Sequence, residues 1–499
     1  MQNRLSRRRW TNAAFFAATA HLAGSVAIRP VFAAVQNPAS DAPTTNPLVP
    51  KILAPRTSDV ANGDYGPYLT YQEMQVKIAD WVRLYPQTIQ VSSLGKTFEG
   101  RDIPLLRLSA APGDAPEVLL LSGIHPREQQ PQIGVAALVD DLLTSYRKDA
   151  ALTKLLRERV IWIVPVLNVD GKVYDMQHGD GKARGADWRK NRHPNSDGKT
   201  VGVDLNRNWG VRWGGNRQVD PGWNASTQDG KGDIYEGIAP LSEPEDQALA
   251  QFIQSRRGHL HGFLDIHSPL RALFAPTYLI GPEHDRYRAL LDGMRARQKQ
   301  PYPTTELRRD AEPPPGARGG NSGTTYNWVY YTQGVYALNL EFAPPKEARS
   351  GIRARYAPPR EIESEYMRNV RGPVLYFIEA VGGLPLPRSG SATIAAGSGT
   401  TDRPPVPGAT VSWTPPAITG DWASAILVSE GAEVSVASEY RKAPLSGGFT
   451  LLIDAKAKPG TAVPMTLYVW DKERGVTTAP LNLRVAESIA PRSAAGTER

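Results

Sequence analysis

The 499-residue sequence contains no cysteine. This absence excludes disulfides, thiolate metal sites, iron–sulfur clusters and thiol nucleophiles, so any bound metal must be held by histidine, aspartate or glutamate. Hydrophobic residues make up 40% and charged residues 22% of the chain, which excludes a fibrous or wholly disordered protein. The length exceeds that of one ordinary domain and predicts two folded units, or one large unit with an appendage.

Acidic residues are missing from the first 33 positions, which hold five arginines. The whole chain has a formal net charge of +8, but without this segment 53 basic residues face 50 acidic ones, so we expect no nucleic-acid partner. A basic run at 6–10, an apolar stretch at 13–28 and small residues at 31–33 predict an export signal of the twin-arginine type over residues 1–33. An uncleaved membrane anchor is the alternative, although the apolar stretch is shorter than the ~20 residues of a membrane span.

No later segment is long and apolar enough to cross a bilayer. We therefore expect an exported protein, periplasmic or extracellular, without stable membrane insertion once the signal is removed. A monomer is expected.

Hydrophobic patterning predicts an α/β domain over residues 65–383, after a linker at 34–64 that is rich in proline, alanine and threonine. Helical spacing at 71–84 and near 133–146 alternates with continuous apolar runs, which are typical of central strands covered by helices on both faces. These runs lie at 118–121, 160–166, 260–266 and 335–342. The alternation predicts a mixed, mostly parallel central sheet.

The composition changes again after residue 383. Residues 384–408 are rich in proline, glycine, serine and threonine and are predicted to be a second linker. Short β-type runs separated by turn residues follow over 409–487 and predict a small all-β sandwich of the immunoglobulin-like kind, an accessory domain. Residues 488–499 are predicted to be a tail.

Several polar residues stand where apolar runs end. His125 and Glu128 follow the run 118–121, and a histidine and a glutamate at this spacing can both face one metal ion. His267 follows the run 260–266, where the loops of an α/β sheet converge on a ligand crevice. Asp265, two residues earlier on the same face, can orient a neighbouring imidazole. Taken singly, each motif also fits an ordinary surface loop.

Glu341 ends the apolar run near 335–342, and no basic residue follows it before Lys346. A carboxylate in this position is costly unless it has a partner such as a metal or an attacking water, and it suits a general base. Arg189 and Arg207 lie in W-R-K-N-R and G-V-D-L-N-R-N segments. An arginine can clamp a carboxylate or neutralise an oxyanion, although each one alone also fits a solvated surface charge.

In chain order, these segments resemble the zinc metallocarboxypeptidases of the carboxypeptidase A family. The matching motifs are H-x-x-E at 125–128, W-R-K-x-R at 188–192, G-V-D-L-N-R-N at 202–208, D-x-H-S at 265–268 and L-E-F at 340–342. The resemblance covers residues 65–383 and implies a carboxypeptidase-like fold. It also implies one zinc ion held by His125, Glu128 and His267.

The resemblance further implies a zinc-dependent exopeptidase that hydrolyses the C-terminal bond of peptides or proteins with a free C-terminus. Arg189 would polarise the scissile carbonyl and stabilise the oxyanion. Asn206 and Arg207 would hold the terminal carboxylate of the substrate. Glu341 would be the general base for a zinc-activated water, and Asp204 would hold the first zinc-ligating histidine.

Two departures from the family pattern concern substrate contacts. Pro269 stands where the family commonly has a tyrosine, and Gly319 stands at the place of its mobile tyrosine, for which Arg318 or Tyr326 could substitute. Tyr326 occupies the position at the floor of the side-chain pocket, where an acid favours basic residues, so it argues against a lysine or arginine preference.

Two other functions remain open on sequence alone. A peptidoglycan stem-peptide hydrolase of the same family would use the same residues. A non-catalytic binding protein on this scaffold is less favoured, because neither a metal ligand nor the base is lost.

Overall fold

The computed structural model describes residues 68–179, 185–214, 230–276, 278–279, 281–305, 307–309, 322–344, 355–357, 359–437 and 440–487. The predicted export signal, the linker at 34–64 and the tail at 488–499 lie outside the described residues, as do Arg318 and Gly319.

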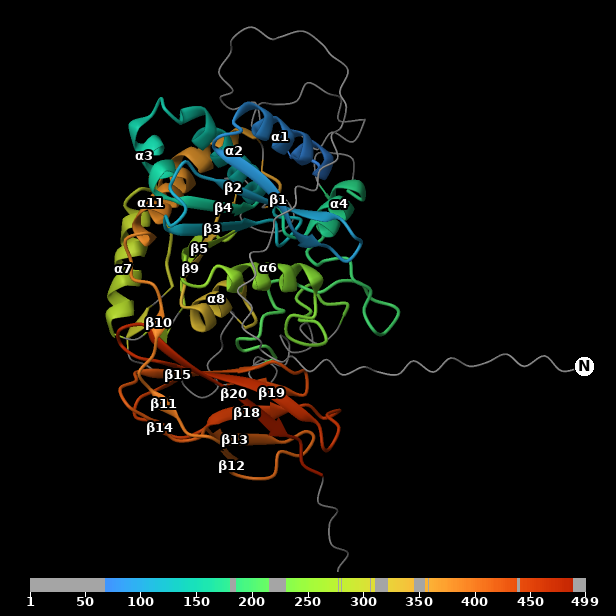
Figure 1. The fold of residues 1–499 in the computed structure, drawn as a ribbon. Coiled ribbons are helices and arrows are strands. Elements are labelled where there is room, and N and C mark those ends of the chain that lie inside the picture. The colour runs from blue at the N-terminus through green and yellow to red at the C-terminus, as the bar shows by residue number, and fades with distance from the viewer. Residues whose placement is uncertain are drawn as a thin grey trace, which may run out of the picture.

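A seven-stranded mixed sheet forms the centre of the α/β part (Figure 1). Its four inner strands run parallel, whereas two strands at one edge and one at the other run antiparallel to their neighbours. In spatial order the strands are β1 (Ile89–Lys96), β2 (Asp102–Leu108), β4 (Val160–Val164), β3 (Glu117–Ser122), β5 (Leu260–His267), β9 (Tyr336–Glu341) and β6 (Ala272–Phe274). The predicted fold class is confirmed.

Helices cover both faces of this sheet, and each face has its own apolar cluster. Successive residues of β3 alternate between the two clusters, as expected of a strand buried on both sides. One face packs against α1 (Tyr71–Leu84), α2 (Gln129–Ser145), α3 (Ala150–Glu158), α7 (Gly281–Arg295), α10 (Pro359–Glu365), the π-helix η3 (Tyr366–Val370) and α11 (Arg371–Val381). The other face packs against α6 (Pro244–Ser255) and α8 (Thr325–Gln333).

Smaller elements complete the α/β part. Helix α4 (Val169–Gln177) follows β4 after a short turn, and β7 (Tyr278–Leu279) pairs in parallel with β8 (Arg308–Arg309). The apolar runs predicted as central strands are β3, β4, β5 and β9, each within one or two residues at most ends. Helix α2 begins at Gln129, four residues before the first apolar position of the predicted helix, which places Glu128 at its N-cap.

The C-terminal part consists of two larger sheets, ordered β10-β20-β19-β15-β17 and β12-β13-β18-β16, with apolar side chains of both sheets in one core. This core confirms the predicted all-β character. A two-stranded sheet joins β11 to β14. The bounds are β10 (Arg388–Ser389), β11 (Thr393–Ile394), β12 (Thr400–Thr401), β13 (Thr410–Thr414), β14 (Ile418–Thr419), β15 (Ser424–Ser429), β16 (Val434–Val436), β17 (Tyr440–Lys442), β18 (Phe449–Ile453), β19 (Ala462–Trp470) and β20 (Gly475–Arg484).

The stretch 384–408, predicted as a linker, contributes the short strands β10, β11 and β12. Its main chain pairs with the all-β part because β10 adds to β20 and β12 adds to β13. Composition alone therefore underestimated the order of this stretch.

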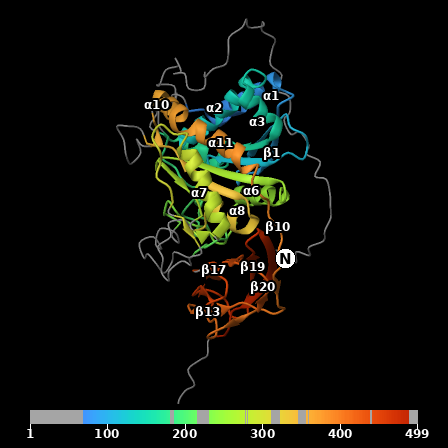
Figure 2. The ribbon, with the colours of Figure 1, turned by 90° about the vertical axis from the view of Figure 1, so that its left-hand side faces the viewer.

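The all-β part packs against the face of the α/β part that carries α6 and α8 (Figures 1 and 2). Trp470 donates a hydrogen bond from Nε1 to the carbonyl of Tyr331 in α8 at 3.1 Å. The apolar cluster of this face continues without interruption into side chains of β15, β17 and β19. Within the described part of the chain, every helix is too short or too polar to span a membrane.

Candidate metal centre

The turn that leaves β3 brings His125 and Glu128 to the carboxyl end of the sheet. Gly123 adopts a left-handed conformation with φ 65°, which bends the chain directly after the strand. Glu128 occupies the N-cap of α2, but its side chain makes no capping hydrogen bond. Its carboxylate is therefore free to turn towards the two histidines.

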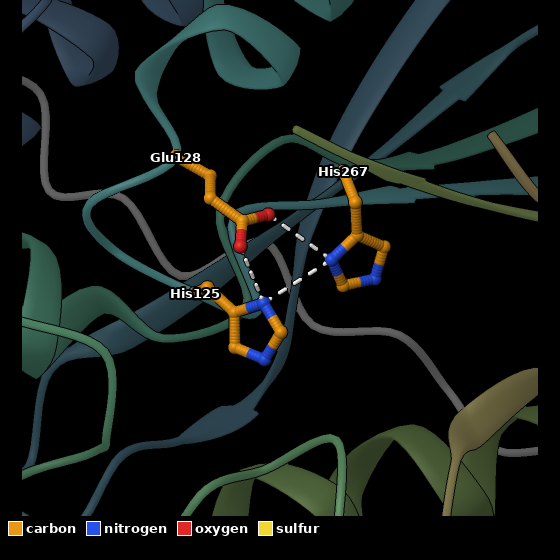
Figure 3. A group of neighbouring side chains, drawn as sticks. All are labelled: His125, Glu128 and His267. Carbon is orange, nitrogen blue, oxygen red and sulfur yellow. Dashed lines mark hydrogen bonds and ion pairs between the residues drawn. The ribbon is translucent and has the colours of Figure 1, made fainter. Parts of the chain in front are cut away.

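Three side chains from two segments, the turn after β3 and the end of β5, meet at this point (Figure 3). His125 Nδ1 lies 2.9 Å from Glu128 Oε1, and His267 Nδ1 lies 3.1 Å from Glu128 Oε2. The two Nδ1 atoms are 3.2 Å apart. All three residues are buried, with exposed fractions of 3%, 6% and 1% in chain order.

This donor set fits a zinc ion. Two imidazole nitrogens and a carboxylate are ligands that zinc accepts, and ligand atoms around a tetrahedral zinc ion lie roughly 3.3 Å apart. The observed separations of 2.9, 3.1 and 3.2 Å are close to that value. Three protein ligands leave a fourth position open, which is the arrangement of catalytic rather than structural zinc sites.

Each histidine has a carboxylate behind it. His125 Nε2 lies 3.0 Å from Asp204 Oδ1, and His267 Nε2 lies 3.0 Å from Asp265 Oδ1. Such contacts fix the ring orientation and keep the proton on Nε2, so that Nδ1 is available to a metal. Asp204 and Asp265 thus each lie beside one of the two histidines.

Charge interactions among these groups shift their pKa values more than burial does. Burial alone would raise the pKa of Glu128, but the neighbouring His125 and His267 hold it well below its ordinary value. Burial would likewise raise the pKa of Asp204, but Arg189 and His125 hold it well below its ordinary value. Burial alone would lower the pKa of His267, but Asp265 and Glu128 raise it. The net pKa of His267 is well above its ordinary value.

The predicted oxyanion and carboxylate groups lie around the same pocket. Arg189 donates from Nε to Asp204 Oδ2 at 2.8 Å, and its Nη1 is 3.8 Å from Glu128 Oε1. Asn206 Nδ2 is 3.3 Å from His267 Nε2. Arg207 donates to the carbonyl of Asn206 at 2.6 Å and lines the pocket beside Asn206.

Glu341 faces this pocket from the end of β9, in register with His267 on β5. Only 7% of its surface is exposed, and Oε2 accepts a hydrogen bond from the backbone of Leu270 at 3.3 Å. Burial raises its pKa to about 7, against the lowering effect of His267. A carboxylate with such a pKa can take up and release a proton near neutral pH.

Two predicted substrate-contact positions lie in the described chain. Tyr326 and Pro269 both line the pocket, and burial raises the pKa of the Tyr326 hydroxyl above its ordinary value. Because Arg318 and Gly319 lie outside the described residues, the expected substitution of a mobile tyrosine remains a prediction.

Three supporting contacts were not predicted from the sequence. Thr325 donates from both its backbone nitrogen (3.0 Å) and its hydroxyl (3.1 Å) to Asn206 Oδ1, which holds this amide in place. The backbone nitrogen of Ser268 donates to Glu128 Oε2 at 3.1 Å. Arg355, which also lines the pocket, donates from Nη1 to both carboxylate oxygens of Asp187, at 2.7 and 2.8 Å. No motif marks these residues, since each contact depends on tertiary packing.

The fold, the buried two-histidine, one-glutamate cluster and the surrounding arginines define a metallopeptidase-type site. A family model described as zinc carboxypeptidase matches residues 74–371. The chain belongs to this zinc carboxypeptidase family.

Named relatives and solved structures agree with this assignment. A zinc carboxypeptidase of Saccharothrix mutabilis subsp. capreolus is 36% identical over 161 residues, 32% of this chain and 36% of that protein. An inactive metallocarboxypeptidase, ecm14, of Sclerotinia sclerotiorum is 32% identical over 254 residues, 48% of this chain and 40% of that protein. The structure of bovine thrombin-activatable fibrinolysis inhibitor in complex with tick carboxypeptidase inhibitor superposes with a TM-score of 0.51 at 21% identity, covering 63% of this chain and 97% of that one.

This chain spans about half or less of the length of the first curated relatives that it matches. One of these relatives is named as inactive. Family membership therefore establishes the scaffold.

Proposed function

We propose that this protein is an active zinc-dependent carboxypeptidase that removes the C-terminal residue from peptides or proteins. The observation that carries the proposal is the convergence of His125, Glu128 and His267 in a pocket that Glu341 and Arg189 also line. A group that could hold a metal ion and a buried carboxylate with a raised pKa line the same pocket. A non-catalytic scaffold has no need for this combination.

The donor set supports a zinc ion at His125, Glu128 and His267. Bound there, zinc would supply Lewis acidity and lower the pKa of water in the site. Glu341 would accept the proton of the attacking water and deliver it to the leaving amine. Arg189 would donate hydrogen bonds to the negative charge that develops on the carbonyl oxygen.

Selection of the C-terminal bond is assigned to Asn206 and Arg207. An arginine beside an amide can hold the terminal carboxylate of a peptide through charge-assisted hydrogen bonds. Thr325 fixes the Asn206 amide, so this clamp is preorganised before substrate arrives. A peptide whose C-terminus is amidated should accordingly be a poor substrate.

The first 33 residues support export to the periplasm or beyond, with peptides as the partners of a monomeric enzyme. Peptidoglycan stem peptides remain the alternative substrates, because the same clamp would hold them. Rates of hydrolysis of C-terminally varied peptides, compared with those of isolated stem peptides, would separate these two sources.

The decisive test combines metal analysis with hydrolysis of a blocked dipeptide, with and without a chelator. We expect about one zinc per chain, loss of activity on chelation and recovery on zinc addition. Glu341→Gln should lower turnover by roughly 10²–10⁴-fold while zinc stays bound, because the base acts only in the chemical step.

Glu379→Gln is the matched control, since Glu379 is an exposed acid on α11. It should leave turnover unchanged. Undiminished activity in Glu341→Gln would remove Glu341 from the mechanism, and an inert, zinc-loaded wild type would refute the proposed function.

A further inference from the structure

Asn339 on β9 carries a buried side-chain oxygen for which the described chain provides no donor. Only 4% of this residue is exposed, and it lines the same pocket as the three candidate metal ligands. Its Oδ1 accepts no hydrogen bond from any described residue. Because a buried acceptor without a donor is costly, a group that enters the pocket and donates to this oxygen gains more than it would in water.

The side chain of Asn339 is also unusual for its place in the sheet. Asparagine is depleted in strands, and the other residues of β9 before Glu341 are tyrosine, alanine and leucine. The backbone of Asn339 pairs with Asp265 on β5 and with Phe274 on β6, so the ladder does not need a polar side chain here. A polar residue that neither suits the strand nor bonds through Oδ1 to the described chain points to a ligand.

The register of the sheet places this amide further into the pocket than the proposed base. Glu341 pairs with His267 at the carboxyl edge, and Asn339 lies two residues earlier on β9. Residues two apart on a strand face the same side, at a spacing of roughly 6.6 Å along the strand. A substrate whose scissile bond lies beside Glu341 therefore needs a long C-terminal side chain to reach Asn339.

The neighbours of the amide in the pocket are aromatic. Phe274 pairs with Asn339 from β6, and Tyr326 reaches the pocket from α8. Asp265 directs Oδ1 to His267 Nε2 at 3.0 Å and is not among the described residues that line the pocket. Two rings beside an uncharged amide suit a planar, neutral side chain that carries a polar group at its tip.

Resting on the proposed carboxypeptidase function, we propose that Asn339 is a specificity-determining residue that selects C-terminal tyrosine over phenylalanine. Asn206 and Arg207 hold the terminal carboxylate, and the tyrosine ring extends into the pocket until its hydroxyl donates to Asn339 Oδ1. A hydroxyl both donates and accepts, so it matches the oxygen and the nitrogen of the amide. The ammonium group of lysine only donates, and its charge costs more to bury.

The competing role of Asn339 is to stabilise the fold, and the two roles predict different effects on stability. If the amide serves a ligand, Asn339→Leu removes an unpaired polar group from a buried position, and the free energy of unfolding should stay equal or rise. If the amide supports the fold, the same change should lower it. Urea unfolding of the full-length protein measures this difference.

The kinetic test uses zinc-loaded, full-length protein and blocked dipeptides with one penultimate residue and C-terminal tyrosine, phenylalanine or lysine. We expect kcat/KM for tyrosine to exceed that for phenylalanine by about tenfold or more. Asn339→Leu should bring this ratio to within about threefold of unity, through a loss for tyrosine. Asn339→Val suits a strand and is the second variant if Asn339→Leu does not fold.

Phe274→Leu is the matched control, because Phe274 lines the pocket at the same level without a hydrogen-bonding group. It should change kcat/KM for tyrosine and phenylalanine alike and leave their ratio unchanged. A ratio that falls as far in Phe274→Leu as in Asn339→Leu would assign the selection to the shape of the pocket and overturn the role of the amide.

A binding test removes the dependence on turnover. The probes are 3-(4-hydroxyphenyl)propanoate and 3-phenylpropanoate, which have the carboxylate and the ring but no scissile bond. They differ only in the hydroxyl, so calorimetry reports its contribution directly. The hydroxylated probe should bind the wild type about fivefold or more tightly, and Asn339→Leu should remove this advantage.

The outcomes separate the two proposals. Equal hydrolysis of the tyrosine and phenylalanine substrates by the wild type overturns the role of Asn339 and leaves the carboxypeptidase function intact. A tyrosine advantage that survives in Asn339→Leu, or faster hydrolysis of lysine than of tyrosine, also overturns that role. No hydrolysis of any peptide by zinc-loaded protein overturns the proposed function itself.

Discussion

Two buried acids at the start of α6 have pKa values that burial raises. Glu245 and Asp246, in the first turn of α6, are fully buried. Burial raises the pKa of Glu245 to about 7, although hydrogen bonds from the Phe98 backbone and the Asn191 side chain oppose this shift. Burial also raises the pKa of Asp246 well above its ordinary value, and the charge of Glu245 adds to this effect. Folding therefore favours the protonated form of both groups.

Stability should fall as pH rises through this range. An acid with a raised pKa in the folded state binds more protons there than in the unfolded state between its ordinary value and about 7. Glu245 should therefore cost about 3 kcal/mol of stability at pH 8 relative to pH 4. Glu245→Gln should flatten this dependence in urea unfolding, whereas Glu379→Gln, at an exposed acid, should not. An unchanged pH slope in Glu245→Gln would contradict the raised pKa.

The turn between β3 and α2 positions two of the three candidate metal ligands, His125 and Glu128. Gly123 has a left-handed φ of 65°, and a Cβ built on it would lie 2.9 Å from the Cα of Val166. The backbone of the neighbouring segment thus approaches too closely for any side chain. Asn168 donates a backbone hydrogen bond to the carbonyl of Gly123 at 3.0 Å, which ties the two segments together.

Gly123→Ala should displace the turn and with it His125 and Glu128. The strained φ and the backbone clash together should cost roughly 2–4 kcal/mol in unfolding free energy. Zinc affinity should fall as well, measured by competition with a chelator. Gly100→Ala is the matched control, because Gly100 has φ 83° but open space around its Cβ position, so it carries the backbone strain without the clash. Equal effects of the two changes on zinc affinity would show that the approach to Val166 does not position the ligands.

The central strands could be predicted from the sequence, because a strand that is buried on both faces of the sheet appears as a continuous apolar run. The start of α2 could not, since its first turn, from Gln129 to Gln132, is polar yet buried against the site. The strands β10, β11 and β12 were missed because pairing with distant residues orders a sequence that has the composition of a linker.

Some residues of the candidate site could be predicted from the sequence, and others could not. Motifs indicated the metal ligands and the arginines, because these chemistries need particular residue types at particular spacings. The pairing of Asp265 with Asn339 depends on the register between β5 and β9, which no local pattern encodes. The support of Asn206 by Thr325 likewise joins residues 119 positions apart.

At the scale of the whole molecule, the all-β part is joined to the α/β part through a buried polar contact as well as the shared apolar cluster. Arg474 in the turn before β20 is 3% exposed and donates to Glu283 of α7 at 2.6 Å. It also bonds to the carbonyl of Gly334, directly after α8, and its guanidinium lies 4.1 Å from the centre of the Tyr336 ring. Since α8 carries Tyr326, the all-β part supports one wall of the pocket.

Arg474→Ala should destabilise the whole protein, because it removes a buried cation that contacts α7, α8 and β9 together. We expect a loss of about 3 kcal/mol, typical of breaking a buried ion pair. Calorimetry should show one unfolding transition for wild type, moved to lower temperature in the variant. Arg403→Ala is the matched control, since the pair of Arg403 with Asp402 is exposed, and it should change stability by less than about 0.5 kcal/mol. Two transitions in wild type, with only the all-β one sensitive to Arg474, would make the all-β part an independent module rather than a support for the pocket.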